Sequence, residues 1–375
     1  GFVAALLLVG FADEWFTFLP AGLFESLRAD LGLTYAQAGL VLAGLSLGGI
    51  VGLVFEAAAD YVSRRWLATL GALAYGGAMI AFGLGDGFWP LFAAAFVWGA
   101  ASDAFIHGCE VALVDLAGDA LPKALARSNA WSAVGDLLAP LVIAAAALAG
   151  LDWRWLFVGG GGLMLAYGGW LASYRFPPPS PPEAHASPFA GLLAVVADTR
   201  VLLLAAIMGL YALLDEPLVA FLIAFLEAQG HDPAWAVTLP LGLLIGGLAG
   251  FGVAEHLAER VTPRRLLAPT ASFMALALPA MLFGPPLVVV AAGFGFGVTG
   301  AIFYTALQGV ILTLRPGQAG STGAVVSAVG LAGAAFPGLV GAVSDAHGLA
   351  AGLLLYAAVP ALVLGLTAAL RIRGA

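Results

Sequence analysis

The sequence predicts an all-α integral membrane protein whose twelve transmembrane helices form two pseudo-symmetric bundles of six. Of its 375 residues, 62% are hydrophobic and only 10% are charged, and the mean hydropathy is +1.02. Soluble domains carry about 25% charged residues, so this composition indicates a membrane protein. A proline-rich stretch near the middle, with motifs that recur on both sides of it, indicates two halves.

A helix that crosses a membrane needs about 20 mostly apolar residues. The chain contains twelve such stretches, and we expect spans at residues 2–23, 36–56, 66–84, 90–116, 125–149, 154–173, 200–226, 235–256, 264–283, 286–313, 318–343 and 349–370. The first stretch is apolar from Gly1 onward and shows no signal-peptide pattern, so we expect an initiating segment before it.

The basic residues predict the orientation of the chain. Of fourteen Lys and Arg residues, only Arg28 and Arg154 fall in loops on one side of the predicted spans. Because cytoplasmic loops carry an excess of Lys and Arg, we expect both termini in the cytoplasm of a multi-pass protein of the inner (plasma) membrane. The single cysteine, Cys109, cannot form an internal disulfide and is expected to pack in a helix core.

A linker is expected at residues 175–198. Its first part reads RFPPPSPPEAHASP, which is polar and too rich in proline to form a helix or to span a membrane. It separates an N-terminal six-helix bundle at 1–174 from a C-terminal six-helix bundle at 199–375. We expect the linker to be cytoplasmic.

Three motifs occur twice in the same order, at a nearly constant separation along the chain, which indicates an internal duplication. The first is an acidic pair followed by a glutamate, the second an acid followed by two arginines, and the third the run Ser-Ala-Val-Gly. The copies are Asp13-Glu14 with Glu25 and Asp215-Glu216 with Glu227; Asp60 with Arg64-Arg65 and Glu259 with Arg264-Arg265; and Ser132 to Gly135 and Ser327 to Gly330.

These features resemble the major facilitator superfamily over essentially the whole chain. The family has six plus six helices, a cytoplasmic central loop and the loop pattern Gly-x-x-x-Asp-Arg-x-Gly-Arg-Arg after spans 2 and 8. The first copy keeps Asp60, Arg64 and Arg65 and departs from the pattern at Glu56, Tyr61 and Ser63. The run Asp-Trp-Arg-Trp-Leu-Phe at 152–157 is also similar to the family's entry into span 6. The span 5 motif of drug/proton antiporters is only faintly present, in Gly135 and Pro140, so the subfamily is open.

The acid–arginine clusters after spans 2 and 8 are candidates for a conformational latch. Such clusters can hold neighbouring helices together in one state and release them in another. The alternative is ordinary anchoring at the cytoplasmic surface. The latch residues would be Asp60, Arg64, Arg65, Glu259, Arg264 and Arg265.

Ionisable residues inside the predicted spans are the candidate functional residues, because carboxylates are costly in hydrocarbon. Asp103, His107 and Glu110 share one face of span 4 at positions i, i+4 and i+7. The resemblance implies a central cavity lined by spans 1, 4, 7 and 10. It would collect Asp13 or Glu14, the span 4 acids and histidine, and Asp215 or Glu216, together with Tyr304, Thr305 and Gln308 from span 10. Asp136 in span 5 is a further candidate.

No lysine or arginine lies inside these four spans to balance the acids. A buried carboxylate without a basic partner is protonated, faces water or holds a cation. Each possibility suits a carrier that exchanges protons for a cation, with a proton gradient as energy source and no cofactor. Pro217, directly after the second acidic pair, is expected to kink or break span 7 and leave a carbonyl free near the acids.

We therefore expect a secondary active transporter that exports a cationic substrate in exchange for protons by alternating access. The substrate would be an organic cation, favoured by nearby aromatic residues, or a divalent metal held by Asp103, His107 and Glu110. One alternative is a proton-coupled importer of a neutral metabolite such as a sugar, in which Tyr304, Thr305 and Gln308 bind the substrate. Another, an intramembrane hydrolase, lacks the three or four metal ligands it would need, so we expect no enzyme. We expect a monomer in the lipid bilayer that binds no nucleic acid.

Overall fold

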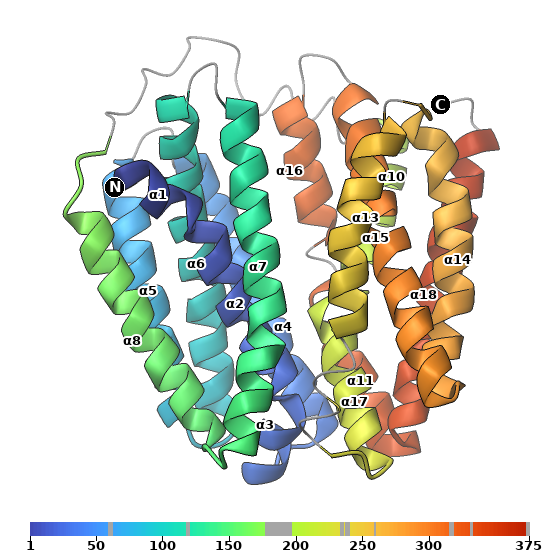
Figure 1. The fold of residues 1–375 in the computed structure, drawn as a ribbon, viewed down its shortest axis with the longest axis horizontal. Helices are drawn as coiled ribbons and strands as arrows, with labels where there is room; N and C mark the ends of the chain where they lie inside the picture. Colours follow the sequence, from blue (N-terminus) through green and yellow to red (C-terminus); the bar gives the residue numbers. More distant parts are fainter. Residues whose placement is uncertain are drawn as a thin grey trace. The chain divides into compact units, whose positions relative to one another are not determined.

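The computed structural model describes residues 1–58, 63–117, 121–176, 197–232, 236, 241–258, 260–314, 319–330 and 333–372. The described residues are almost all helical and include no strand. The expected all-α membrane fold is confirmed. The chain divides into two compact units: an N-terminal unit, mainly Gly1–Glu183, and a C-terminal unit, mainly Ala184–His231, Thr238–Phe336 and Ala342–Ala375 (Figure 1).

The N-terminal unit contains the first six predicted spans. Its helices are α1 (Phe2–Leu7), α2 (Val9–Gly22), α3 (Phe24–Asp30), α4 (Tyr35–Ala58), α5 (Arg64–Leu84), α6 (Phe88–Ala117), α7 (Leu121–Leu148) and α8 (Trp153–Ala172). Leu8 separates α1 from α2, and together these two helices form the first span. Helix α6 packs against both α4 and α5, α5 packs against α8, and α2 packs against α7 (Figure 1).

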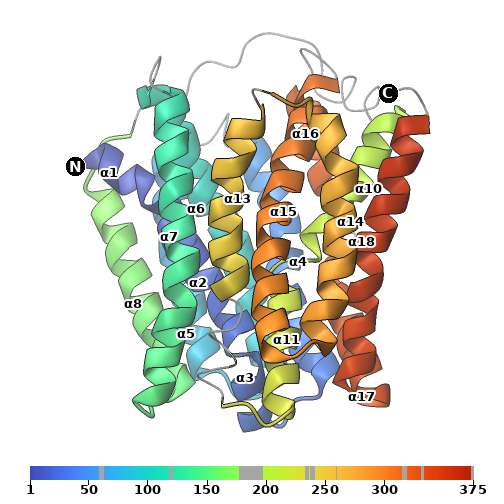
Figure 2. The same ribbon diagram turned by 45° about the vertical axis from the view of Figure 1, so that its right-hand side comes forward.

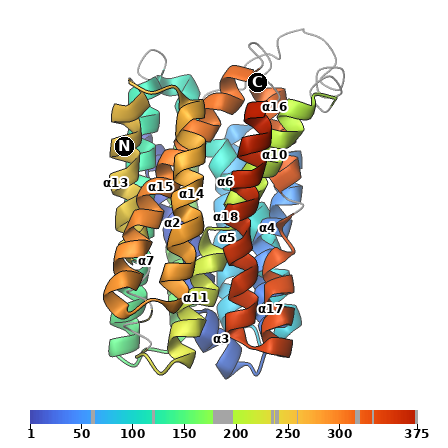
Figure 3. The same cartoon turned by 90° about the vertical axis from the view of Figure 1, so that its right-hand side faces the viewer.

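The C-terminal unit repeats this pattern of helix pairs. Its helices are α10 (Thr199–Ala212), α11 (Glu216–Ala228), α13 (Leu241–Ala258), α14 (Pro263–Phe283), α15 (Pro286–Leu314), α16 (Ala319–Gly330), α17 (Phe336–His347) and α18 (Leu349–Ile372). Helix α15 lies between α13 and α14 (Figure 2). Helix α14 also packs against α18 (Figure 3), and α10 packs against α16.

Ten helical stretches in the described part of the chain are long and apolar enough to cross a membrane, and a shorter apolar one covers Leu241–Ala254. One predicted span is corrected. The stretch 318–343 was expected to be one helix, but it forms α16 and α17 with a break between them. Pro337 lies in the first turn of α17, where its missing N–H costs nothing, whereas inside a continuous helix it would remove a backbone hydrogen bond.

Close helix contacts at glycines show that the two units are repeats in a constant register. In the N-terminal unit, Gly48 of α4 lies against the Phe96 carbonyl of α6; in the C-terminal unit, Gly246 of α13 lies against the Phe294 carbonyl of α15. The same register links Gly44 to Gly242, Gly52 to Gly250 and Gly99 to Gly297. Lipid offers no hydrophobic drive for helix association, so glycines that let backbones approach closely are how these pairs pack.

Candidate functional site

The structural repeat also shows which residues of span 1 correspond to which residues of span 7. This alignment differs from the alignment that the acidic motifs suggested. Gly135 of α7 lies against Phe11 of α2, and Gly209 of α10 lies against Gly330 of α16. Phe11 and Gly209 are thus equivalent, in the same register that links Gly48 to Gly246. After each span the chain turns through a glycine with positive φ, Gly32 (60°) and Gly230 (89°), again in this register.

The two acidic pairs therefore do not occupy equivalent positions. In the register of the glycines, Asp13 corresponds to Tyr211, and Asp215 corresponds to Thr17. Asp215 lies four residues after Tyr211 and beyond the end of α10, so the two acidic pairs lie at different heights along their spans. The acids of span 7 must be explained by their own surroundings, because they are not a copy of the acids of span 1.

Asp13 is held from a neighbouring helix. The Ser102 hydroxyl of α6 donates a short hydrogen bond to Asp13 Oδ1. The Tyr75 hydroxyl of α5 lies 3.5 Å from the Asp13 carbonyl oxygen, which also accepts a 2.8 Å hydrogen bond from Thr17 Oγ1. Ser102 and Tyr75 are both buried. Neither was singled out in the sequence, because a serine and a tyrosine among apolar residues give no signal of their own.

Asp103, the next residue of α6, lies against a glycine. A side chain at Gly52 of α4 would overlap the Asp103 carboxylate, so the absence of a side chain there creates the space that Asp103 occupies. Further along the same helix, His107 Nδ1 lies 3.9 Å from Glu110 Oε2, and the Glu110 side chain is 56% exposed. The predicted polar face of span 4 is therefore present, and two of its members are paired.

The C-terminal unit carries neutral side chains at each position equivalent to this polar set. On α15, Gly300 replaces Ser102, Ala301 replaces Asp103, Thr305 replaces His107 and Gln308 replaces Glu110. Helices α5 and α14 correspond with their N-caps, Ser63 and Thr262, aligned. This alignment places Met274 at the position of Tyr75. The ionisable groups on α6 thus have no charged counterpart on α15.

An aromatic and amide cluster forms in the C-terminal unit instead. The Tyr211 ring lies 5.4 Å from that of Phe303 and 6.0 Å from that of Tyr304, the latter nearly parallel at 28°. Gln308 Nε2 donates a 2.7 Å hydrogen bond to the Tyr304 hydroxyl. The predicted residues Tyr304 and Gln308 are thereby brought together with Tyr211, and the exposed Gln308 side chain offers an amide to a ligand.

The expected break in span 7 is present. Helix α10 ends at Ala212, α11 begins at Glu216, and Pro217 lies in the first turn of α11. Pro217 has no N–H to donate to the Leu213 carbonyl, so the helical hydrogen-bond pattern is interrupted at this point. Asp215 lies in the break with non-helical backbone angles (φ −101°, ψ −142°) and is exposed, while Glu216 is half-buried.

The remaining predicted site residues lie in varied surroundings. Glu14 and Asp136 are half-buried on α2 and α7. Asp60 and Glu259 lie outside the described residues, so the latch stays a prediction. Arg65 Nη2 donates a 2.7 Å hydrogen bond to the Ala172 carbonyl at the end of α8. Of the other latch arginines, Arg64 is buried whereas Arg264 and Arg265 are exposed.

Within the described residues, no three His, Cys, Asp or Glu side chains come close enough together to hold a metal ion. The candidate metal set of Asp103, His107 and Glu110 is therefore not assembled as a site in this structure. Within this set His107 Nδ1 lies 3.9 Å from Glu110 Oε2, which is a loose contact.

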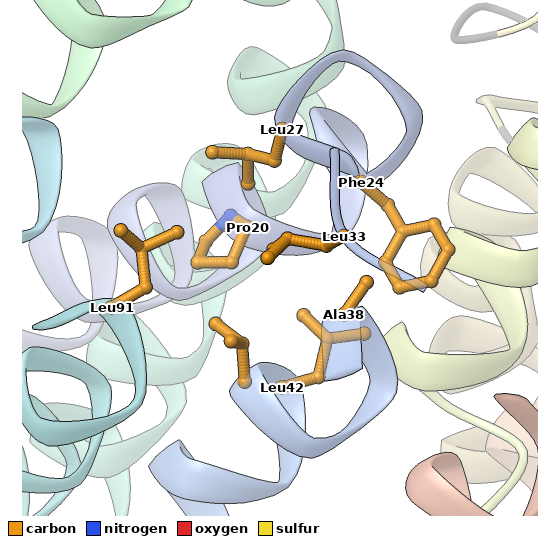
Figure 4. Close-up of a pocket in the computed structure, with 8 residues that line it drawn as sticks. Pro20, Phe24, Leu27, Leu33, Ala38, Leu42 and Leu91 are labelled. Atoms are coloured by element: carbon orange, nitrogen blue, oxygen red, sulfur yellow. The ribbon is translucent and has the colours of Figure 1, made fainter. Parts of the chain in front are cut away.

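A small pocket between α3 and the start of α4, in the N-terminal unit, is a packing void. It holds about 10 Å³ and is lined only by apolar side chains, most of them from α3 and the start of α4 (Figure 4). Its lining residues are Pro20, Phe24, Leu27, Leu33, Ala38, Val41, Leu42 and Leu91. An apolar void of this size stays dry and offers a substrate no polar partner. The polar groups on α2 and α6 in one unit, and those on α15 in the other, remain the candidate functional residues.

Comparison with known proteins identifies the family of the chain. The sequence profile of the Major Facilitator Superfamily matches residues 6–337. The chain belongs to the major facilitator superfamily. Its members are transporters of small molecules, and the coarse functional expectation is thereby confirmed. No curated protein matches the sequence at a significant level.

Several solved major facilitator structures share the fold. The nucleoside transporter NupG has a TM-score of 0.82 at 13% identity, covering 99% of each chain. A bacterial homologue of the human lysosomal transporter Spinster, inward-facing and unoccupied, has a TM-score of 0.81 at 16% identity, covering 98% of this chain and 95% of that one. A D-xylose–proton symporter has a TM-score of 0.75 at 14% identity, covering 97% and 96%. At such identities the likeness concerns the fold alone.

Proposed function

We propose that this chain is a proton-coupled antiporter that exports a lipophilic organic cation by alternating access of its two halves. The observation that carries the proposal is the set of carboxylates on α2 and α6, two helices that contain no lysine or arginine. Asp13 and Asp103 would exchange protons for the cation. A carboxylate inside a membrane favours either a proton or a cationic ligand.

The cation is proposed to be organic, because the described residues assemble no metal site. The aromatic rings of Tyr211, Phe303 and Tyr304 would contribute cation–π attraction. Asp215, at the break in span 7, would add a carboxylate close to the Leu213 carbonyl, which receives no backbone hydrogen bond from Pro217. The major energetic contribution is proposed to come from the carboxylates, and the rings would select for flat, apolar cations.

A second candidate function is proton-coupled import of a neutral metabolite. The observation in its favour is the neutral cluster of Tyr304 and Gln308, whose amide and hydroxyl groups suit an uncharged polar substrate. The structurally similar proteins include a nucleoside transporter and a D-xylose–proton symporter. In this case the carboxylates of α2 and α6 would carry only the proton.

The two functions are separated by a flux assay in proteoliposomes that contain an internal pH dye. Ethidium, Mn²⁺, uridine and xylose are added in turn to wild type, Asp103→Asn and Asp215→Asn. Asp152→Asn is the control, because Asp152 caps α8 outside the membrane core. We expect ethidium alone to move protons in wild type and in the control, and in neither site variant. Proton movement with uridine or xylose would favour the importer, and unchanged coupling in both site variants would remove the carboxylates from the mechanism.

We propose that the protein lies in the inner membrane with both termini, and the loops that carry most of the arginines, on the cytoplasmic side. Arg65, which caps the end of α8 through the Ala172 carbonyl, would then lie at the cytoplasmic surface with the proposed latch. Cysteines introduced singly at Ser173 and at Asp86 test this in whole cells. A membrane-impermeant maleimide should label position 86 and spare position 173; the reverse pattern contradicts the orientation.

A further inference from the structure

The hydrogen bond between Ser102 and Asp13 joins two helices that otherwise meet over a short stretch. Helix α2 packs mainly against α7, and its contact with α6 is much smaller. The Ser102 side chain is only 6% exposed, and its hydroxyl donates to Asp13 Oδ1. Asp13 is thus turned toward α6 and toward the polar face that begins with Asp103.

We propose that Ser102 is a positioning residue that holds the ionised Asp13 carboxylate against α6 and thereby ties the protonation of Asp13 to the contact between α2 and α6. The inference rests on the proposed function, in which Asp13 carries a proton. It adds a residue that is not itself ionisable. Ser102 acts through Asp13 and need not touch a substrate.

The chemistry of the pair supplies the coupling. A serine hydroxyl has one proton to donate, and a carboxylate is the stronger acceptor while it is charged. When Asp13 takes up a proton, the charge-assisted hydrogen bond becomes a weaker neutral one, so the link between α2 and α6 loosens. Tyr75, buried on α5, lies with its hydroxyl 3.5 Å from the Asp13 backbone carbonyl and is a second polar neighbour of the same residue.

The C-terminal unit shows that helix packing does not require this serine. At the equivalent position α15 has Gly300, and Tyr211 replaces Asp13. A side chain at Gly300 would come within 3.2 Å of the Tyr211 hydroxyl, so positions 300 and 211 also face each other in this unit. Helices α10 and α15 pack together without a hydroxyl–carboxylate pair. Ser102 is thus an addition of the N-terminal unit, found where that unit has its carboxylate.

Other titratable groups surround Asp13 and must be kept constant in a test. They come from α2 itself and from the helices that pack against it: Glu14 on α2, Tyr75 on α5, Asp103 and Glu110 on α6, Asp136 on α7 and Tyr167 on α8. Helix α1 carries none, and those of α3 lie at the far end of the span. None of these residues changes in the variants below.

The test follows Asp13 directly by infrared spectroscopy of the purified full-length protein in lipid nanodiscs. The carbonyl band of a protonated carboxyl group that disappears in Asp13→Asn is titrated with pH. Loss of the Ser102 donor should favour the protonated acid, so Ser102→Ala is expected to move the midpoint of this band upward by about 1 to 2 pH units. Ser102→Thr keeps the hydroxyl and should restore the wild-type midpoint.

Ser132→Ala is the matched control. Ser132 lies on α7 against Gly10 of α2, and its hydroxyl bonds to the Ser128 carbonyl of its own helix, so its removal changes the surroundings of α2 without touching Asp13. We expect it to leave the midpoint unchanged. Should Ser102→Ala not yield folded protein, Ser102→Cys takes its place, because a thiol is a much weaker donor of similar size.

Each outcome decides a separate question. A midpoint that moves in Ser102→Ala and returns in Ser102→Thr supports the positioning role. A band that titrates with Asp13 but does not move in Ser102→Ala or Ser102→Cys overturns this inference and leaves the proposed function standing. If no band depends on Asp13 at any pH, Asp13 carries no proton, and both the inference and that part of the proposed function are wrong.

Discussion

Replacing Gly52 with alanine should impair proton coupling, although position 52 carries no polar side chain. The new methyl group would overlap the carboxylate of Asp103 and force it out of its present position. Displacing a functional group by about 1 Å can cost on the order of 100-fold in rate. We therefore expect proton-coupled transport by Gly52→Ala to fall between about 10-fold and 100-fold.

The effect on stability should be small by comparison. Overpacking a helix contact costs about 1–3 kcal/mol, while replacing a helical glycine with alanine returns about 1 kcal/mol through helix propensity. A net loss of about 0–2 kcal/mol follows, which a shift in the thermal unfolding midpoint in detergent would show. The transport loss in Gly52→Ala would thus exceed what unfolding explains.

Gly250→Ala provides the matched comparison, because Gly250 occupies the equivalent position on α13. Its new methyl group would meet the Val298 carbonyl and the Ala301 side chain, and no carboxylate. We expect a similar loss of stability and unchanged coupling. Equal loss of coupling in both variants would mean that general helix packing is responsible. Wild-type coupling in Gly52→Ala would show that the position of Asp103 does not matter.

Three further predictions concern other parts of the chain. Arg154→Ala should lower the free energy of unfolding by about 2 kcal/mol, measured by thermal or denaturant unfolding, because Arg154 donates to the Gly83 and Gly85 carbonyls as well as pairing with Asp30. Asp30→Asn removes the half-exposed ion pair and keeps an amide oxygen that can accept from Trp153 Nε1, so it should cost less than about 1 kcal/mol. Pro217→Ala should allow the broken span 7 to regain helix, and we expect slower transport at unchanged or higher thermal stability; faster transport would contradict a role for the break. Gln308→Leu should raise the substrate KM by about 5-fold to 10-fold with little change in maximal rate, a loss of one hydrogen bond of about 1 kcal/mol; an unchanged KM would place the substrate elsewhere.

The fold was largely predictable because hydrocarbon imposes strict conditions on a sequence. Long apolar stretches of about 20 residues predict helices, and the proposed linker at 175–198, most of which lies outside the described residues, predicts two sets of six. The break at Pro217 was also predictable, because proline removes a specific backbone hydrogen bond. Span 11 was predicted wrongly as one helix. The apolar run continues through Pro337, so hydropathy alone gives no boundary there. In the structure Pro337 lies in the first turn of α17 and does not kink a longer helix.

The repeat shows where motif reasoning misled. Two similar acidic pairs suggested that Asp13 and Asp215 are equivalent, but the contacts of Gly135 and Gly209 pair Asp13 with Tyr211. Short acidic strings can arise independently one turn apart, whereas glycines that touch a neighbouring backbone cannot move without separating the helices. The partners of the acids, Ser102 and Gly52, could not be found from the sequence either. Each becomes visible only when another helix brings a carboxylate against it.

The carboxylates of the N-terminal unit are proposed to release protons when a cation binds. The most direct test is proton release from the purified protein in lightly buffered detergent solution, followed with a pH indicator as ethidium is added. We predict proton release by wild type, reduced release by Asp13→Asn and by Asp103→Asn, and none by the double variant. Full release by the double variant, with ethidium still bound, would contradict the account.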